Sequence, residues 1–404
     1  MPVAANHRHD VIVVGAGVVG CSTAFRLAQA GRRVLVLEKR GIASGASGRN
    51  GGNLAAGSAM FGDAGAVVFK IKQANIAMVK NLAEELDADF ELRWSGGMTL
   101  ALTEANWEHI QESYRLQKAA GLDVQLLDAY ETRQAMPALT DAVIGSDFAR
   151  GQGHLWPFKL VHGFANAARR LGAEFRLGVT VEKLVRAGDR VTGVMVDGET
   201  LEADDVVLCT NAYTPLIVPD LPKGALVPAR GQILVTQGLP ELIPHTFGTN
   251  FEKEYGRQTA DGKILCGGFR RLDEDEGLGH YEERVSPAVL SGIASCLSTL
   301  FPRLKTVRIV RCWAGIMGFT ADGLPLLGRA GFAPGLTIAA GFNGGGFSWA
   351  TITGQIVADL LTGKSPQFEL SHFSPDRFLG SGMTWSNPYT LGEHSNATGV
   401  APVH

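Results

Sequence analysis

Residues 10–38 read DVIVVGAGVVGCSTAFRLAQAGRRVLVLE, and this stretch decides the fold of the chain. It begins with a short apolar and β-branched run, Asp10–Gly15, which is typical of a buried parallel strand. Residues Gly17–Ala30 then have the apolar spacing of a helix. A second buried strand follows at Val34–Leu37 and ends at Glu38. The stretch therefore predicts a strand–helix–strand unit at the front of the chain.

Three glycines between the first strand and the helix have the spacing Gly15-x-Gly17-x-x-Gly20. Gly15 permits a tight turn, Gly17 lets the backbone approach a pyrophosphate, and Gly20 lets the helix pack closely on the strand. The helix N-terminus offers free N–H groups and a partial positive charge to phosphates. Glu38 is placed to accept hydrogen bonds from a ribose 2′-hydroxyl, and its charge would repel a 2′-phosphate. We therefore predict a dinucleotide site for NAD or FAD, with NADP disfavoured.

Three further segments favour FAD over NAD. Ser44–Gly52 (SGASGRNGG) has glycines that allow contact with a flat ring or a phosphate, and Arg49 can neutralise negative charge, although a flexible surface loop is the alternative interpretation. The loop Gly341–Phe347 (GFNGGGF) lies between a strand and a helix and directs a second helix N-terminus at the anionic edge of a reduced flavin. Thr180 and Val181 can offer backbone groups to adenine.

The composition excludes several classes of protein. The chain has 404 residues, enough for two or three domains and a large core. Its 37 basic and 40 acidic side chains leave a formal charge of −3, so nucleic acid and anionic membranes are not expected as partners. The 51 glycines follow no G-X-Y period, which excludes collagen. The hydrophobic fraction of 45% argues against disorder.

The cysteines are odd in number and form no C-x-x-C pair, so we expect reduced thiols in a cytoplasmic protein, and neither disulfides nor a metal site. Residues 1–10 lack the apolar stretch of a signal peptide. Between Arg329 and Asp359 there is no charged residue but there are seven glycines. This composition favours a buried strand, a loop and a buried helix over a membrane helix.

Buried strands are expected at the front, the middle and the end of the chain, with antiparallel β-structure between them. This order predicts an α/β nucleotide-binding domain built from discontinuous pieces, with an α+β domain inserted twice. We assign residues 1–89, 150–220 and 313–378 to the nucleotide-binding domain and residues 90–149 and 221–312 to the inserted substrate domain. Residues 379–404 are rich in Gly, Ser, Asn and Thr, and we expect a poorly ordered tail or one that lies on the surface.

The order of these motifs, together with CWAGIMGFTADGLPLLG and GFNGGGFSWATITGQIVADLLTG, resembles the D-amino acid oxidase-type FAD-dependent oxidoreductases over about residues 10–378. That family includes glycine and sarcosine oxidases, D-amino acid dehydrogenases and gamma-glutamylputrescine oxidoreductase. The SGRNGG stretch is most similar to the last of these. The resemblance implies FAD bound by a glutathione-reductase-type Rossmann domain, an antiparallel substrate domain, and oxidation of an amine or amino acid to an imine.

Motifs and resemblance together give a set of expected cofactor contacts. They are Gly15, Ala16, Gly17, Val18, Gly20, Glu38, Lys39, Ser47, Gly48, Arg49, Asn50, Gly51, Gly52, Val181, Thr210, Asn211, Gly315, Gly341, Asn343, Gly344, Gly345, Gly346 and Phe347.

The implied chemistry needs no nucleophile or metal, because hydride passes from the amine carbon to flavin N5 and the imine is then hydrolysed. Tyr255 and Arg257 alternate along a strand and share a face, where Arg257 can hold a substrate carboxylate. A solvated edge strand is the alternative interpretation. Trp313, Asn343 and Ser348 complete the expected substrate site, with Phe347 and Trp349 as further aromatic candidates that core packing also explains.

Two positions distinguish branches of the family. Ser348 stands where the sarcosine oxidase branch has a lysine that binds the substrate carboxylate, so a larger or differently anchored amine is favoured. Cys312 lies near the position of a cysteine that bonds covalently to the flavin in the sarcosine oxidase and amadoriase branches, but the following WAG is similar to non-covalent branches. We therefore expect non-covalent FAD.

Two alternatives remain beside an amine oxidase that uses O2 or another acceptor. One is a D-amino acid or opine dehydrogenase that passes electrons to a quinone or a partner subunit. The other is a flavin-fold binding protein without catalysis, although its expected marks, a broken glycine motif or a missing acid, are not seen in the sequence.

Overall fold

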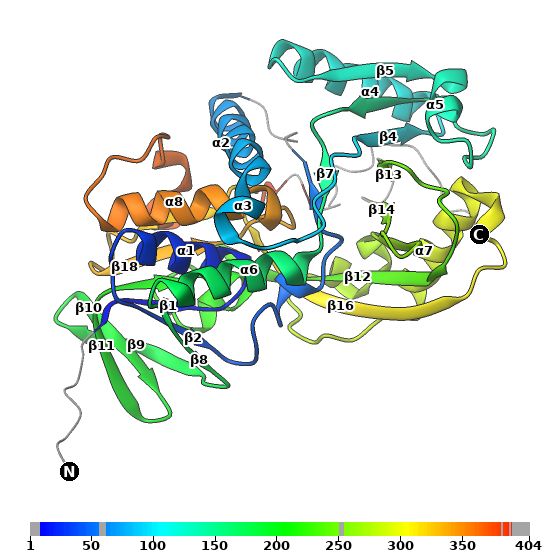
Figure 1. Ribbon diagram of the computed structural model, residues 1–404. Helices are drawn as coiled ribbons and strands as arrows, with labels where there is room; N and C mark the ends of the chain where they lie inside the picture. Colours follow the sequence, from blue (N-terminus) through cyan, green and yellow to red (C-terminus); the bar gives the residue numbers. More distant parts are fainter. Residues whose placement is uncertain (1–8, 56–61, 250–253, 381–382, 388, 390–404) are drawn as a thin grey trace.

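The computed structural model describes residues 9–55, 62–249, 254–380, 383–387 and 389, which form two large β-sheets and the helices packed on them (Figure 1). The first sheet contains parallel strands in the order β18-β11-β1-β2-β8, and β17 pairs antiparallel with β18. A hairpin of β9 and β10 extends it by pairing with β11. The strands are β1 (His9–Val14), β2 (Val34–Glu38), β8 (Glu174–Leu177), β9 (Val181–Ala187), β10 (Arg190–Val196), β11 (Glu199–Leu208), β17 (Leu326–Arg329) and β18 (Leu336–Ala340).

Three helices, α1 (Val18–Gln29), α6 (Pro157–Arg170) and α8 (Ala350–Leu361), cover one face of the first sheet, with α1 between the other two (Figure 1). Helix α1 is buried from Val18 to Ala28 because it packs on the sheet and on both neighbouring helices. Its contact with β1 depends on Gly20, since a Cβ there would lie 1.9 Å from the Gly15 carbonyl oxygen. This is the close helix–strand packing that the glycine motif predicts.

The second sheet has the order β16-β12-β15-β14-β13-β4-β6-β5, and its pairs are antiparallel except for β13 with β4. Helix α7 (Pro287–Leu300) packs on β12 and β15, while α4 (Glu104–Ala119) and α5 (Ala129–Ala135) cover the β4-β6-β5 end (Figure 1). The strands are β4 (Gly97–Ala101), β5 (Val124–Asp128), β6 (Gly145–Ala149), β12 (Leu226–Gly238), β13 (Thr246–Thr249), β14 (Tyr255–Gln258), β15 (Lys263–Gly267) and β16 (Ile309–Thr320).

Shorter elements connect the two parts. Helix α2 (Gly62–Lys80) packs on α8, and α3 (Leu82–Leu86) packs on α6. The two-stranded ladder of β3 (Asn53–Leu54) and β7 (Gly153–His154) joins residues that follow β2 to residues that precede α6. The chain thus passes from the first sheet to the second and back more than once.

The predicted fold class is confirmed, because a mostly parallel sheet with helices is interrupted by a largely antiparallel sheet. The strand β16 crosses residue 313, where the sequence suggests a domain boundary, and it pairs along its length with β12 of the second sheet. The domain bounds themselves stay a prediction. Within the described part of the chain, no helix has the length and apolar character needed to cross a membrane.

Two local expectations need correction. The last helix begins at Ala350 and not directly after the loop Gly341–Phe347, because residues Gly346–Ser348 first form a 3-10 turn. The segment 383–387 does not lie on the surface throughout, because Asn387 is only 4% exposed. Its Nδ2 donates hydrogen bonds to the Thr320 carbonyl oxygen (2.6 Å) and to Asn343 Oδ1 (2.8 Å). Residues 390–404 of the expected tail lie outside the described residues.

Candidate cofactor and substrate site

A cavity of about 1120 Å³ opens where four parallel strands of the first sheet end. Strands β1, β2, β11 and β18 finish side by side, since Val14 pairs with both Leu37 and Leu208, and Leu208 pairs with Ile338. In open α/β sheets, ligands bind outside the carboxyl ends of the strands. The cavity therefore lies where the strand–helix–strand unit predicts a dinucleotide.

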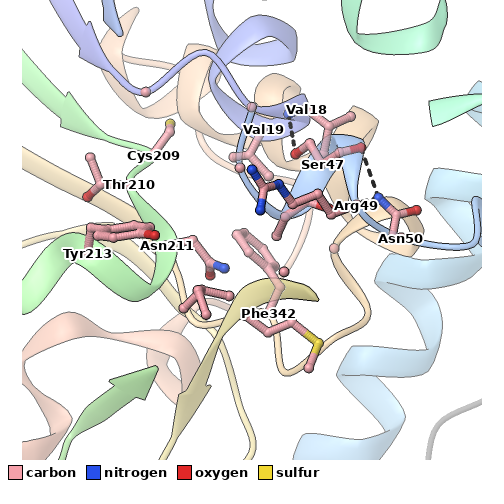
Figure 2. A pocket seen from close by; sticks show the side chains of 18 of the residues that line it. Val18, Val19, Ser47, Arg49, Asn50, Cys209, Thr210, Asn211, Tyr213 and Phe342 are labelled. Atoms are coloured by element: carbon pink, nitrogen blue, oxygen red, sulfur yellow. Dashed lines mark hydrogen bonds between the residues drawn. The ribbon is translucent and has the colours of Figure 1, made fainter. Parts of the chain in front are cut away.

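The turn after β1 presents the N-terminus of α1 to the cavity. Gly15 has φ = 102°, and a Cβ on it would lie 2.8 Å from the Cys209 carbonyl oxygen, so glycine is required. Helix α1 starts at Val18, whose N–H donates to Ser47 Oγ (2.9 Å; Figure 2). Gly15, Gly17 and Val18 all line the cavity. The positive end of the helix dipole and free backbone N–H groups fit a pyrophosphate at this point.

Glu38 ends β2 and lines the cavity, as the motif predicts. Its Oε2 accepts the Ala16 N–H (2.9 Å) and its Oε1 accepts the Arg40 N–H (2.8 Å). Each carboxylate oxygen has two lone-pair sites, so capacity remains for ribose hydroxyls. The carboxylate thus fixes the turn after β1 and still faces the cavity.

The loop Ser44–Gly52 forms one wall. Arg49 donates to the carbonyl oxygens of Ser44 (3.2 Å) and Ala314 (2.9 Å), and its guanidinium forms an ion pair with Glu283 (2.6 Å). Arg40 also pairs with Glu283 (3.0 Å). The charge of Arg49 is therefore partly neutralised within the protein, so that it is not a free cation awaiting a phosphate.

The loop that follows β18 forms a second wall, and Asn343 fixes its shape. Asn343 has φ = 50°, its Oδ1 accepts the Thr320 N–H (3.1 Å), and its Nδ2 donates to the Gly341 carbonyl oxygen (2.7 Å). These bonds leave Asn343 as a positioning residue of the loop. Residues 342–347 line the cavity.

Figure 2 shows how the two sides of the cofactor part face each other. Ser47, Arg49 and Asn50 lie on one side of the space, and Thr210, Asn211 and Tyr213 lie on the other. Asn211 follows β11, and its Oδ1 accepts the Gly341 N–H (2.9 Å), which ties that segment to the loop after β18.

The second sheet closes the remaining side of the cavity. Its contribution comes from β12, β14, β16 and the turn after β15, and includes Gln232, Tyr255, Arg270, Met317 and Phe319. Burial raises the pKa of Tyr255, so its phenol stays neutral and can donate a hydrogen bond. Tyr389, from the C-terminal segment, also lines this end.

Three predicted substrate residues do not line the cavity. The Arg257 guanidinium donates to the carbonyl oxygens of Gly51 and Leu155, so it is directed at the backbone and not at the cavity. Trp313 donates its indole N–H to the Arg49 carbonyl oxygen (3.1 Å) and packs against the same small apolar cluster as Tyr255. Ser348 Oγ accepts the Ala55 N–H (3.1 Å). Each of these side chains supports a cavity wall from behind.

Most expected cofactor residues do line the cavity, and the exceptions among the described residues are Ala16, Gly20, Gly48 and Gly341. Their contribution is to packing or to the backbone. At Gly48, for example, a Cβ would lie 2.2 Å from the Ala43 carbonyl oxygen. The contacts of these residues with FAD stay predictions.

The sequence analysis did not predict several of the residues that line the cavity. Tyr213 and Tyr281 pack with ring centroids 5.2 Å apart, and Glu283, Arg270 and Tyr389 supply polar groups. The segment Leu278–Ser286 carries neither a glycine motif nor a strand pattern, which hid Tyr281 and Glu283. A charged residue two positions after the Gly267-Gly268 pair was the one available signal for Arg270.

Cys312 is exposed and lies outside the cavity lining. A thiol must approach the flavin ring to bond with it, so this placement supports non-covalent binding. In the residues that the structure describes, no cluster of three or more His, Cys, Asp or Glu side chains is arranged to hold a metal ion.

The donor set fits a dinucleotide that carries a flat ring. A helix N-terminus suits the pyrophosphate and Glu38 suits the ribose. Walls of glycine-rich backbone at 50–52 and 344–346 leave room for a ring to lie against main chain.

Comparisons with known proteins agree with this geometry. The family model of the FAD-dependent oxidoreductases (DAO) matches residues 10–360. The chain is 28% identical to a glycine oxidase from Geobacillus kaustophilus, covering 93% of this chain and 98% of the relative. It is also 28% identical to the gamma-glutamylputrescine oxidoreductase of Escherichia coli, covering 94% of this chain and 90% of the relative. Among solved structures, glycine oxidase from Geobacillus kaustophilus superposes with a TM-score of 0.85 at 27% identity, covering 93% of this chain and 100% of that one. The L-proline dehydrogenase from P. horikoshii gives a TM-score of 0.83 at 26% identity, with coverage of 92% and 98%.

Proposed function

The chain belongs to the DAO family of FAD-dependent oxidoreductases, which act on CH–NH or CH–NH2 donors, and from this we propose that it oxidises the carbon–nitrogen bond of a larger amine or amino acid. When bound, FAD accepts the two electrons of this oxidation as hydride from the carbon next to nitrogen. The nitrogen loses its proton, and the resulting imine is hydrolysed to a carbonyl compound and an amine or ammonia.

One observation carries the proposal. A single cavity extends from the turn at Gly15 and the carboxylate of Glu38 to Tyr255 and Phe319 on the second sheet. The first sheet provides the groups suited to a dinucleotide, and the second sheet provides a separate wall where a substrate can lie against the ring. Orientation of the reacting carbon is the main task that remains for the protein.

The choice of a larger amine rests on the chain's own residues. Ser348 stands where the sarcosine oxidase branch has a lysine that binds the substrate carboxylate, and its hydroxyl oxygen accepts the Ala55 N–H. The two relatives with the same 28% identity carry names with different substrates, glycine and gamma-glutamylputrescine. The SGRNGG stretch favours an enzyme similar to the second.

Anaerobic bleaching of the flavin tests the proposal. FAD-loaded protein is mixed with gamma-glutamylputrescine, putrescine, glycine, sarcosine, L-proline, and D- and L-amino acids, and the flavin absorbance is followed. We expect gamma-glutamylputrescine or another long amine to bleach the flavin faster than glycine or sarcosine. Faster bleaching by glycine would contradict the substrate class, and no bleaching by any amine would contradict the activity.

The electron acceptor is tested with the same preparation. Reoxidation of the reduced protein by O2 within the turnover time would identify an oxidase. Slow reoxidation by O2 with fast reoxidation by a soluble quinone would identify a dehydrogenase.

The cysteines all carry free thiols in the structure, which supports our proposal of a cytoplasmic location.

A further inference from the structure

Arg270 places a guanidinium at the second-sheet end of the cavity. Its Nη2 donates to the Tyr389 carbonyl oxygen (2.7 Å) and its Nη1 donates to the Glu276 carbonyl oxygen (3.2 Å). Its Cζ lies 4.7 Å from the centre of the Phe319 ring. Both hydrogen-bond partners are neutral, and three of the five guanidinium N–H groups are left for another acceptor.

The other cationic guanidiniums of the cavity have acidic partners. Arg40 and Arg49 both pair with Glu283. Arg270 forms no ion pair with any carboxylate of the described residues. Burial lowers the pKa of Arg270, and the charge of Glu276 opposes this although Arg270 contacts Glu276 through its backbone carbonyl oxygen. The substrate end of the cavity therefore contains a half-buried cation that still lacks an anion.

A different ion pair, between Arg230 and Asp273, fixes the position of Arg270. Arg230 is fully buried and binds Asp273 with two hydrogen bonds, of 2.7 Å from Nε and 2.9 Å from Nη2. Asp273 also accepts a hydrogen bond from Gln232 (3.0 Å). Since Asp273 follows the short turn Arg270–Leu272, this pair holds the turn against β12 and occupies the Asp273 carboxylate. Arg270 is consequently held without being neutralised.

The C-terminal segment completes the arrangement. Asn387 is buried, and it bonds to Thr320 and Asn343 as described above. Its Oδ1 accepts the Tyr389 N–H (2.8 Å), which holds Tyr389 where its carbonyl oxygen meets Arg270. One chain of hydrogen bonds thus links the loop after β18, the C-terminal segment and Arg270.

We propose that Arg270 is the anion-binding residue of the substrate end, taking the carboxylate of an amino-acid-like substrate, and that the segment ending at Tyr389 holds it in position. This assignment rests on the proposed function and specifies its substrate class as an amine that carries a carboxylate. It replaces Arg257, which does not line the cavity and whose guanidinium donates to the backbone carbonyl oxygens of Gly51 and Leu155. A free planar guanidinium can bind a carboxylate through two parallel hydrogen bonds.

Benzoate is the probe for the anion site, because its binding can be followed by the absorbance of the flavin without any turnover. We expect benzoate to perturb the spectrum of the FAD-loaded protein saturably. Arg270→Gln should raise the dissociation constant roughly 30-fold, and Arg270→Lys should lie between, since it keeps the charge without the planar fork. Arg271→Gln is the matched control, because Arg271 is exposed and lies outside the cavity lining. It should bind benzoate as the unmodified protein does.

Absence of a saturable perturbation in the unmodified protein, or unchanged benzoate affinity in Arg270→Gln, would overturn the assignment. An equal loss in Arg271→Gln would do the same. If no amine bleaches the flavin while benzoate binding still depends on Arg270, the proposed oxidation fails and the anion site stands. If amines bleach the flavin, Arg270→Gln should lower kcat/KM for the best amino-acid substrate. For the matching amine that lacks the carboxylate, kcat/KM should change by no more than about twofold.

Two truncated chains test the role of the C-terminal segment in anion binding. A chain that ends after residue 391 keeps the Tyr389 carbonyl, whereas one that ends after residue 388 loses it. We expect only the shorter chain to weaken benzoate binding, by about tenfold, at unchanged FAD content. Equal benzoate affinities of the two chains would overturn the role of Tyr389.

Discussion

At the scale of single residues, Glu38 belongs to the fold and to the cofactor site at once. Two backbone N–H groups, of Ala16 and Arg40, already donate to its carboxylate. A buried backbone donor that loses its acceptor costs free energy. Substitution of Glu38 should therefore act on the apoprotein as well as on FAD.

We expect Glu38→Ala to weaken FAD binding by roughly 1.5–3 kcal/mol, because ribose hydroxyls lose a charged acceptor. The protein should purify partly without flavin, and its apo form should melt at a lower temperature than the unmodified apoprotein. Glu38→Gln keeps one carbonyl acceptor and should lie between. Fluorescence titration of apoprotein with FAD measures the affinity, and an unchanged dissociation constant would remove Glu38 from the cofactor site.

His154 is a buried residue whose protonation links pH to stability. It is buried in β7, and its Nδ1 lies 3.3 Å from Ser95 Oγ. Burial, together with the charges of Arg257 and Arg93, lowers the pKa of His154 to about 4. The unfolded chain, with an ordinary histidine pKa near 6.5, therefore binds more protons between about pH 4 and 6.5. Stability contributed by the neutral ring is complete above this range and is lost as the pH falls through it.

We expect His154→Gln to flatten the dependence of unfolding free energy on pH. Between about pH 6.5 and pH 4, the unmodified protein should lose roughly 2 kcal/mol more than this variant. Urea unfolding at several pH values in this range measures the difference. His162→Gln is the control for the loss of an imidazole, since His162 is exposed. Parallel curves for all three proteins would contradict the assignment.

At the scale of elements, the loop after β18 owes its shape to hydrogen bonds of Asn343 and not to every glycine within it. Gly345 has an ordinary φ of −96°, and a Cβ there would lie 3.5 Å from the Phe342 carbonyl oxygen, which is normal contact. A forbidden φ therefore does not require glycine at this position. Space for a ligand is the reason that remains.

We expect Gly345→Val to lower FAD occupancy or the reduction potential of the bound flavin, because the added side chain projects where the ring should lie. The melting temperature of the apoprotein should change little, since the protein itself has room for the side chain. Flavin content, a redox titration and apoprotein melting measure these effects. An unaltered spectrum, potential and turnover would show that the loop does not contact the flavin.

Elements were predictable from sequence where local pattern determines them. The predicted ranges Asp10–Gly15, Gly17–Ala30 and Val34–Leu37 agree with β1, α1 and β2 to within one residue at each end. Strand alternation also placed Tyr255 toward the cavity, but it could not identify the partners of Arg257. Those partners are backbone carbonyls 206 and 102 positions away in the chain.

The prediction for the C-terminal segment was wrong for the same reason, because its hydrogen-bond partners are distant in the sequence. Its polar composition indicates a surface tail, yet Arg270 and Tyr389 meet across 119 positions. Buried polar groups of this kind depend on tertiary partners that composition does not reveal. The cofactor side of the site was therefore largely predictable from local motifs, whereas the substrate side was not.

At the scale of the whole molecule, the cavity lies between the two sheets and is lined by both. Arg40 and Arg49 follow the first strands of the chain, and Glu283 precedes α7 of the second part, so their ion pairs cross the same boundary. The exposed fractions of these side chains are 40%, 26% and 24%, and ion pairs that are this accessible contribute little stability by themselves. A ligand that fills the cavity should contribute more.

We expect removal of FAD to lower the melting temperature of the protein, because FAD binds the folded chain and should contact both sheets. Stabilisation by a ligand follows RT ln(1 + [L]/Kd), which gives about 2.7 kcal/mol at a free concentration of 100 Kd. Calorimetry of the apoprotein with increasing FAD should show a melting temperature that continues to rise after the sites are filled. At equal FAD concentration, the melting temperature of Glu38→Ala should rise less, because its Kd is higher.

If FAD bridges the sheets, limited proteolysis should also cut the apoprotein faster in both parts of the chain. Protection confined to the first sheet would mean that FAD contacts that sheet alone.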